Sequence, residues 1–220
     1  MTWKVIKEKS LIILLLIGLF VLNQGPIILA ALLAKKGNVT PIESVAVDLL
    51  QLFCIALFIY IARRNKIAFT QKVPIGKMIL IALVAFVVVR LINVLGLMVM
   101  SLEGNQQLNN QDTLMNLTQR IPLVNMILFA VFGAPIMEEI MFRGIIPKML
   151  FKNHFKIGLV VGSILFGLAH GVTSLGAFII YAGMGAVFAL IYYKTDHLEN
   201  AMAAHFLNNL VAFAALVLLM

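Results

Sequence analysis

Two adjacent glutamates and an arginine are unusual in this sequence because they lie inside a long apolar segment. Glu138, Glu139 and Arg143 all fall within residues 122–150, which are mostly hydrophobic. A charge at mid-membrane depth costs several kcal/mol, so such side chains usually face a partner or a water-filled cavity. The stretch therefore indicates a site within the membrane at which carboxylates do chemistry.

The spacing of the three residues assigns them different tasks. Glu139 and Arg143 are four residues apart, so they share one face of a helix and can form an ion pair. Glu138 points about 100° away around the helix and remains free for other work. The pattern favours one glutamate that acts and one that is tied structurally, although a Glu139–Arg143 pair could instead simply join helices.

Two later motifs place further polar side chains in apolar segments. The first is Phe166-Gly167-Leu168-Ala169-His170, and the second is His205-Phe206-Leu207-Asn208-Asn209. At about 1.5 Å per residue, Glu138 lies about 18 Å from the inner end of its span and His170 about 21 Å from its own. His205 and Asn209 lie about 14 and 20 Å from theirs. Because these depths agree, we expect the four side chains to share one site.

This set of side chains suits hydrolysis of an amide. A glutamate with a histidine can deprotonate a water molecule. A histidine and an asparagine can donate hydrogen bonds to the oxyanion of a tetrahedral intermediate, each worth about 3 kcal/mol. This scheme requires no cofactor. The alternative left open is a zinc ion held by Glu138, His170 and His205, since two His and one Glu match known catalytic zinc sets, although no HExxH pattern is present.

Composition decides the class of protein. Of the 220 residues, 62% are hydrophobic and 12% are charged, whereas soluble domains have about 45–50% apolar and about 25% charged residues. The sequence predicts an all-α, polytopic transmembrane helix bundle forming one membrane domain over residues 1–220, with N-terminal spans in 1–120 and catalytic core spans in 121–220. The net charge of +8 does not indicate nucleic acid, because the basic residues cluster at the ends of apolar segments.

About seven spans are expected, the first a retained helix rather than a cleaved signal peptide. Their predicted ranges are 10–34, 42–62, 75–101, 121–150, 156–170, 173–193 and 197–220. With a cytoplasmic N-terminus, twelve Lys and Arg residues fall on the inner side and three on the outer side, which favours that orientation. Residues 102–120 are polar and predict an outer loop with a short surface helix.

Several residues within the predicted spans lead to further structural predictions. Gly133-Ala134-Pro135 should open the fourth helix just before the glutamates, which frees carbonyl groups and tends to admit water. Asn23-Gln24, near Pro26, predicts either a packing kink or the polar wall of a cavity. Arg90 lies in the middle of the third span, and we expect it to pair with Asp48 or with a glutamate of the fourth span. Small residues at helical spacing, Gly185 with Ala189 among them, predict close helix packing in the sixth span.

The three motifs in this order, Glu-Glu-x-x-x-Arg, Phe-x-x-x-His and His-x-x-x-Asn, resemble those of the CPBP intramembrane endopeptidases. That family includes the Rce1-like CAAX prenyl proteases and bacterial Abi relatives linked to bacteriocin processing and self-immunity. The resemblance runs from Phe129 to Ala212. It implies that Glu138 is the general base, with His170 as its partner in activating water. It further implies that His205 and Asn209 form the oxyanion hole.

The resemblance also implies that Glu139, Arg143 and Phe166 order the site. The expected activity is that of an intramembrane peptide hydrolase, in CAAX-type or bacteriocin and leader-peptide processing, although the family is commonly labelled as metalloproteases. The expected partners are a peptide or protein substrate, which need not be lipidated, and membrane lipids. The short chain favours an Abi-like protein of a bacterial cell membrane. The alternatives are a catalytically idle immunity or binding protein and a proton-coupled transporter.

Overall fold

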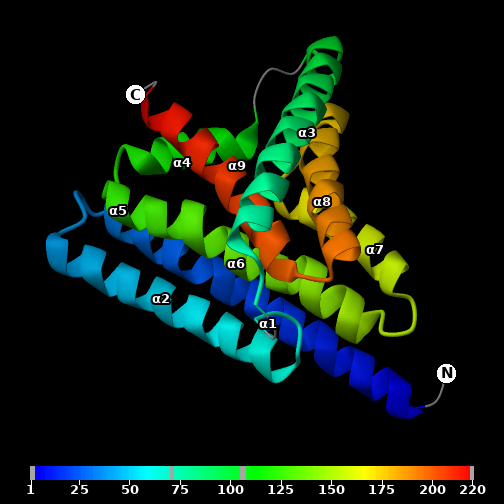
Figure 1. Cartoon of the computed structure of the whole chain (residues 1–220). Helices are drawn as coiled ribbons and strands as arrows, with labels where there is room; N and C mark the ends of the chain where they lie inside the picture. The colour runs from blue at the N-terminus through cyan, green and yellow to red at the C-terminus, as the bar shows by residue number, and fades with distance from the viewer. Residues whose placement is uncertain (1–2, 70–71, 105–107, 219–220) are drawn as a thin grey trace.

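In the part of the chain that it describes, the computed structural model contains helices joined by turns and loops and no strand, which confirms the predicted all-α fold (Figure 1). It describes residues 3–69, 72–104 and 108–218, with the backbone alone for 109–113. Two of the elements, η1 and η2, are π-helical. The elements are α1 (Trp3–Ala34), α2 (Pro41–Arg64), α3 (Ile75–Leu102), α4 (Asn109–Thr118), α5 (Leu123–Met126), η1 (Ile127–Gly133), α6 (Ala134–Glu139), η2 (Ile140–Leu150), α7 (Phe155–Ala169), α8 (Leu175–Thr195) and α9 (Leu198–Leu218).

The helices account for the seven predicted spans. Six are long and apolar enough to cross a membrane: α1, α2, α3, α8, α9, and α5 to η2 taken as one continuous helix, Leu123–Leu150. The remaining span is α7, an apolar helix of 15 residues, shorter than the roughly 20 residues that a full crossing requires. The predicted polar loop contains α4, although its residues 105–107 lie outside the described residues, as do 219 and 220 of the last span. The chain is an integral membrane protein.

The helices form two groups that meet at the glutamate-bearing helix. α1, α2 and the long helix from α5 to η2 run side by side, while α3 packs along α8 (Figure 1). α9 packs against α3, α8 and α6, and α7 packs against both α8 and η2. Helix α6, which carries both glutamates, is therefore in contact with α9, while η2, which carries Arg143, is in contact with α7.

Glycines allow α7 and α8 to approach their neighbours closely. A Cβ added at Gly162 of α7 would lie 2.1 Å from the carbonyl oxygen of Phe142, and one at Gly176 of α8 would lie 2.4 Å from that of Gly96. Gly185, one of the predicted packing residues, lies against the backbone of Ser163. The predicted close packing of the sixth span is confirmed, and it holds α7 and α8 tightly around the polar site.

The fourth span changes its hydrogen-bond pattern where Gly133-Ala134-Pro135 predicted an opening. In a π-helix each N–H bonds to the carbonyl five residues earlier, and the N–H of Ala134 donates to the carbonyl of Phe129. Pro135 lies in the first turn of α6, where its missing N–H is tolerated. The helix does not break, but its backbone is wound more loosely just before the two glutamates.

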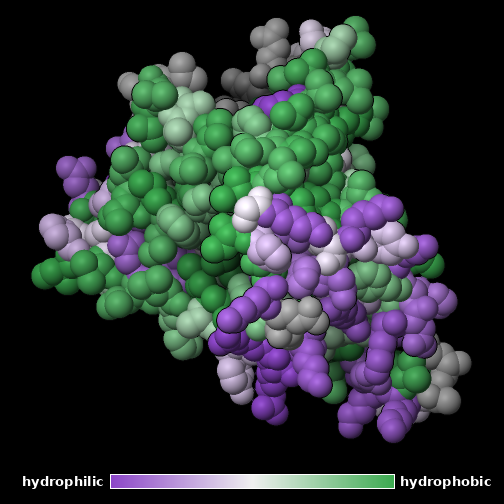
Figure 2. Space-filling view, in the orientation of Figure 1, coloured by the Kyte–Doolittle hydropathy of each residue, from purple (hydrophilic) through white to green (hydrophobic). Residues whose placement is uncertain are grey.

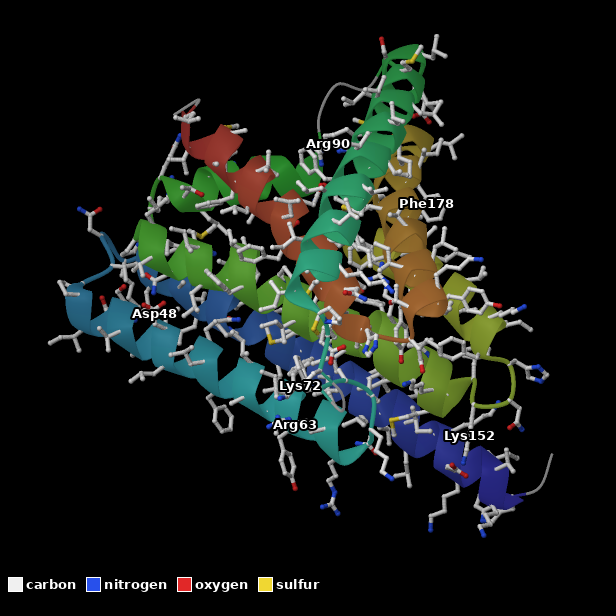
Figure 3. All side chains as sticks on the ribbon, viewed as in Figure 1. Asp48, Arg63, Lys72, Arg90, Lys152 and Phe178 are labelled. Carbon is white, nitrogen blue, oxygen red and sulfur yellow. The ribbon has the colours of Figure 1, made fainter. Side chains whose placement is uncertain are left out.

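Hydrophilic side chains gather at one end of the molecule, the end at which the chain begins (Figure 2). Arg63, Lys72 and Lys152 lie toward this end and Asp48 toward the other (Figure 3). The rest of the visible face is mainly hydrophobic, as expected for a surface in contact with lipid. The gathering of basic residues agrees with the charge bias in the sequence, and the cytoplasmic orientation of the N-terminus stays a prediction.

Candidate active site

Glu139 and Arg143 form the ion pair that their spacing predicts. The Nη1 atom of Arg143 lies 2.9 Å from Oε1 of Glu139, and neither side chain is exposed at all. The guanidinium also lies over the ring of Phe166, with its central carbon 4.2 Å from the ring centroid, a favourable cation–π position. Two opposite charges thus neutralise each other inside the protein, and the pair holds both side chains in one position beside Phe166.

The same glutamate also holds His205 of α9. Oε1 of Glu139 accepts a hydrogen bond from Nδ1 of His205 at 3.0 Å, so this carboxylate joins the glutamate-bearing helix to the last helix. The four-residue spacing predicts only the Glu139–Arg143 pair, so this contact with His205 is an addition from the structure. Because Nδ1 is engaged by Glu139, the orientation of the imidazole is set, and its Nε2 atom is directed toward the second glutamate.

Glu138 is the carboxylate left available for chemistry. Its Oε2 atom lies 4.0 Å from Nε2 of His205, and its side chain is 13% exposed. That Oε2 atom is buried and has no hydrogen-bond partner among the described residues. A buried carboxylate oxygen without a partner is costly, so a water molecule or a substrate group is expected to bind it in the working protein.

His170 lies just beyond the end of α7, where Gly171 turns the chain with a φ of +65°. Its Nδ1 atom is 2.7 Å from the carbonyl oxygen of Phe166. A carbonyl oxygen can only accept, so Nδ1 carries the proton and Nε2 of the neutral ring is an acceptor. The ring stacks on Tyr181 with centroids 4.4 Å apart. These contacts fix the orientation of the His170 ring and therefore the direction of its acceptor atom, Nε2.

Asn209 donates a hydrogen bond to a backbone carbonyl of the fourth span that has no backbone donor within its own helix. Its Nδ2 atom donates to the carbonyl oxygen of Ala130 at 2.9 Å. In the π-helical register the backbone donor for that carbonyl would be residue 135, which is a proline without an N–H. The side chain of Asn209 therefore replaces the missing backbone donor, and one N–H of its amide remains for another acceptor.

Phe166 lies between the polar groups as their common packing surface. It is fully buried, and its ring centroid is 4.5 Å from that of His170 and 5.7 Å from that of His205. With the cation–π contact to Arg143, the Phe166 ring therefore contacts three site residues: His170, His205 and Arg143. The predicted role of Phe166 in ordering the site is compatible with this position.

Two adjoining cavities connect the predicted site residues. The smaller, of about 120 Å³, is lined by Glu138, His170 and Asn209, with Asn23 and Gln24 of α1 on its wall. The larger, of about 280 Å³, is lined by His170, His205 and Asn209. His170 and Asn209 border both, so each of the four predicted side chains lines at least one of two neighbouring cavities. Asn23 and Gln24 form part of the cavity wall, as one of the two sequence interpretations expected.

The prediction for Arg90 was wrong. Its Nη2 atom donates to Oδ1 of Asn208, and it has no ion pair with a carboxylate in the part of the chain that the structure describes. Asp48 instead accepts a hydrogen bond from Asn125 at 2.6 Å. The reason is geometric, because α3 packs against α8 and α9, which turns Arg90 away from α2. Asn208, which the sequence analysis did not single out, links Arg90 to the site.

The residues proposed for zinc do not form a compact set of ligands. Within the described ranges, no three His, Cys, Asp or Glu side chains are grouped closely enough to hold a metal ion. His205 directs Nδ1 to Glu139, and His170 directs Nδ1 to a backbone carbonyl.

Comparison with known proteins places this site in a family. Residues 120–211, which contain all three motifs, match the model of the type II CAAX prenyl endopeptidase Rce1-like family. The chain is 27% identical to YvdC of Lactococcus lactis over 208 residues, 91% of this chain and 77% of that protein. No solved structure matches the chain.

Two relatives carry names that describe an activity. The chain is 33% identical over 101 residues to the putative membrane peptidase YdiL of Bacillus subtilis, covering 46% of this chain and 40% of that one. It is 31% identical over 155 residues to the membrane-embedded CAAX protease MroQ of Staphylococcus aureus, covering 66% and 61%. The chain thus spans less than two thirds of both named relatives. The part of the chain that carries the three motifs is thus similar to membrane peptidases of the CAAX-protease type.

Proposed function

We propose that this protein is an intramembrane endopeptidase in which Glu138 and His170 activate a water molecule to attack a peptide bond. The main support for the proposal is the position of Glu138, which lines a cavity together with His170 and Asn209 and has one carboxylate oxygen without a hydrogen-bond partner among the described residues. The substrate is a peptide or protein segment that enters this cavity from the membrane, in bacteriocin, leader-peptide or CAAX-type processing. The similarity to the putative membrane peptidase YdiL and the CAAX protease MroQ supports this class of reaction.

In the first step, water lies between Glu138 and Nε2 of His170. Glu138 takes a proton from the water, whose oxygen forms a bond with the carbonyl carbon of the peptide. The carbonyl oxygen becomes an oxyanion. When the tetrahedral intermediate collapses, the C–N bond breaks and Glu138 returns the proton to the leaving amine. Atoms and charge balance without a further reactant.

His205 and Asn209 are the donors that stabilise the oxyanion. Since Nδ1 of His205 donates to Glu139, only the doubly protonated ring has an Nε2–H left to donate. Two carboxylates lie beside the ring, with Oε1 of Glu139 3.0 Å from Nδ1 and Oε2 of Glu138 4.0 Å from Nε2. Asn209 contributes its second N–H. Glu139, Arg143 and Phe166 act as positioning residues that fix His205 and the helix surface.

The test is the Glu138→Gln variant, which keeps the shape of the side chain and removes the base. Peptides released from membranes containing the wild-type protein or the variant are compared by mass spectrometry. We expect cleavage products to disappear in the variant while expression, membrane insertion and thermal unfolding stay unchanged. The matched control is Glu8→Gln, an exposed acid on α1, which should cleave normally.

Two outcomes would contradict this scheme. Normal cleavage by the Glu138→Gln variant would show that Glu138 is not the base. Immunity to a bacteriocin that is retained in a non-cleaving variant would instead support a role as a binding protein. Metal analysis of the purified protein is a separate test, since stoichiometric zinc would overturn the metal-free scheme.

A further inference from the structure

Arg90 is a charged side chain at mid-membrane depth for which the proposed mechanism has no use. It lies 12 residues before the end of α3 and 15 after its start, about 18 and 22 Å along the helix. That is too deep for the side chain simply to extend to the interface at either end. A charged residue at this depth normally faces a cavity and serves a ligand or a partner.

The described partners of Arg90 are all uncharged. Nη2 donates to the side-chain oxygen of Asn208, and the guanidinium carbon lies 4.9 Å from the centroid of the Phe86 ring. The Nε atom is buried without a hydrogen-bond partner. A guanidinium has five N–H donors in a planar fork that matches the two oxygens of a carboxylate. The contacts seen here orient this fork without neutralising its charge.

Arg90 borders the larger cavity together with the proposed oxyanion donors. That cavity of about 280 Å³ has Arg90 and Asn208 on its wall as well as His205 and Asn209. Most of its remaining wall is apolar, formed by side chains such as Ile180, Met184, Phe213 and Leu216. A positive charge within an apolar enclosure fits a ligand that carries a carboxylate and hydrophobic groups close together.

Asn208 connects the positive charge directly to the oxyanion site. Its Oδ1 accepts from Arg90, and its Nδ2 lies 3.2 Å from Oδ1 of Asn209. Only the amide side chain of Asn208 therefore separates the guanidinium from the Asn209 amide, the proposed oxyanion donor. A carboxylate bound at Arg90 must belong to a residue within a few positions of the scissile bond.

We propose that Arg90 is a specificity-determining residue that binds a carboxylate of the substrate peptide close to the bond that is cleaved. The proposal rests on the proposed function and adds the class of substrate, namely hydrophobic peptides with a carboxylate near the cleavage point. That carboxylate is either the C-terminus of the peptide or an Asp or Glu side chain. A different role, in which Arg90 only balances the charge of Glu138, would change the affinity for all peptides equally.

The experiment measures peptide binding in a Glu138→Gln background, so the result does not depend on cleavage. Three fluorescein-labelled octapeptides that end in three leucines serve as probes in lipid nanodiscs. One has a free C-terminal carboxylate, one has a C-terminal carboxamide, and one is a carboxamide with glutamate in place of the first of the three leucines. Arg90→Met removes the charge and keeps an apolar stem, while Arg90→Lys keeps the charge. Arg63→Met, an exposed position, is the matched control.

With Arg90 present, the free acid should bind at least about tenfold more tightly than the plain carboxamide, as expected for hydrogen bonds to a charged group. Arg90→Met should reduce this preference for the free acid over the plain carboxamide to below about twofold. Arg90→Lys should retain part of the preference, and Arg63→Met should retain all of it. If the glutamate-containing carboxamide binds like the free acid, the bound carboxylate can be a side chain. If it binds like the plain carboxamide, the bound group is the C-terminus.

Equal binding of all three peptides with Arg90 present would overturn the proposal, even if Arg90→Met fails to fold. An equal loss for all three in Arg90→Met, or no detectable binding of the free acid, would overturn it too. Failure of the proposed function looks different. In that case the Glu138→Gln protein cleaves normally, or the wild-type protein cleaves nothing, while the preference for the free acid persists.

Discussion

Removal of Arg143 should destabilise the protein at its active site, because it leaves Glu139 buried without its main counter-charge. The two groups are 2.9 Å apart and fully excluded from solvent. Without Arg143, the carboxylate of Glu139 keeps one described partner, His205, at 3.0 Å. The Arg143→Ala variant therefore tests whether this pair orders the catalytic groups or merely lies near them.

The expected loss can be worked out from these contacts. Breaking a buried ion pair by removing one partner costs about 3–5 kcal/mol, and the cation–π contact on Phe166 adds about 0.5–2 kcal/mol. Polar groups in membrane proteins find substitute partners in the unfolded state, which lowers such costs. We therefore expect Arg143→Ala to lower the free energy of unfolding by about 3 kcal/mol. Cleavage should fall as well, because His205 loses its fixed orientation.

The assay is reversible unfolding in mixed micelles with increasing dodecyl sulfate, followed by circular dichroism. The single tryptophan, Trp3, is 78% exposed at the start of α1, so its fluorescence would not report on the site. The double variant Glu139→Gln, Arg143→Met removes both charges and should regain more than about 1 kcal/mol. Arg63→Ala, at an exposed position, should change stability by less than about 0.5 kcal/mol. A fully active Arg143→Ala variant as stable as that control would refute the reasoning.

Two further predictions concern the helices that hold the site. Gly162→Ala should destabilise the protein by about 2 kcal/mol or more and reduce cleavage, because the new Cβ would lie 2.1 Å from a backbone oxygen of η2. The control Gly18→Ala, whose new Cβ would have nothing within 4 Å, should be neutral or stabilising in the same dodecyl sulfate unfolding assay. Equal effects of the two substitutions would contradict the packing argument. Asn209→Ala should lower kcat about 10²–10³-fold and lower stability by about 1 kcal/mol, since it leaves the Ala130 carbonyl unpaired. Pro135→Ala restores the backbone donor, so Asn209→Ala should cost less stability in this background than in the wild type. Purely additive effects of the two substitutions would show that Asn209 does not compensate for the proline.

The sequence was sufficient for features that depend on position along a single helix. Apolar run lengths predicted the spans, and the four-residue spacing of Glu139 and Arg143 predicted their ion pair, because helix geometry fixes which side chains share a face. Depth along each helix also indicated that groups from the fourth, fifth and seventh spans could meet. These inferences need only the rise and periodicity of an α-helix.

Features that depend on how each helix is rotated about its axis could not be predicted in this way. Depth alone placed Arg90 near several acids, but the packing of α3 on α8 and α9 turned it toward Asn208 instead. Depth likewise could not tell which glutamate would face His205, since adjacent residues differ by about 100°. The structure assigns Nδ1 to Glu139 and the approach of Nε2 to Glu138.

Pro135 and Asn209 show how a local irregularity and a distant side chain become one feature of the site. The proline was visible in the sequence, and so was its consequence, a carbonyl without a donor. What could not be seen was that an asparagine 79 residues after Ala130 would supply that donor. Because the amide of Asn209 is held by Ala130 on one side and Asn208 on the other, its remaining N–H has a defined direction. The looser winding before the glutamates therefore does more than admit water, since it also creates the acceptor that fixes the proposed oxyanion donor in place.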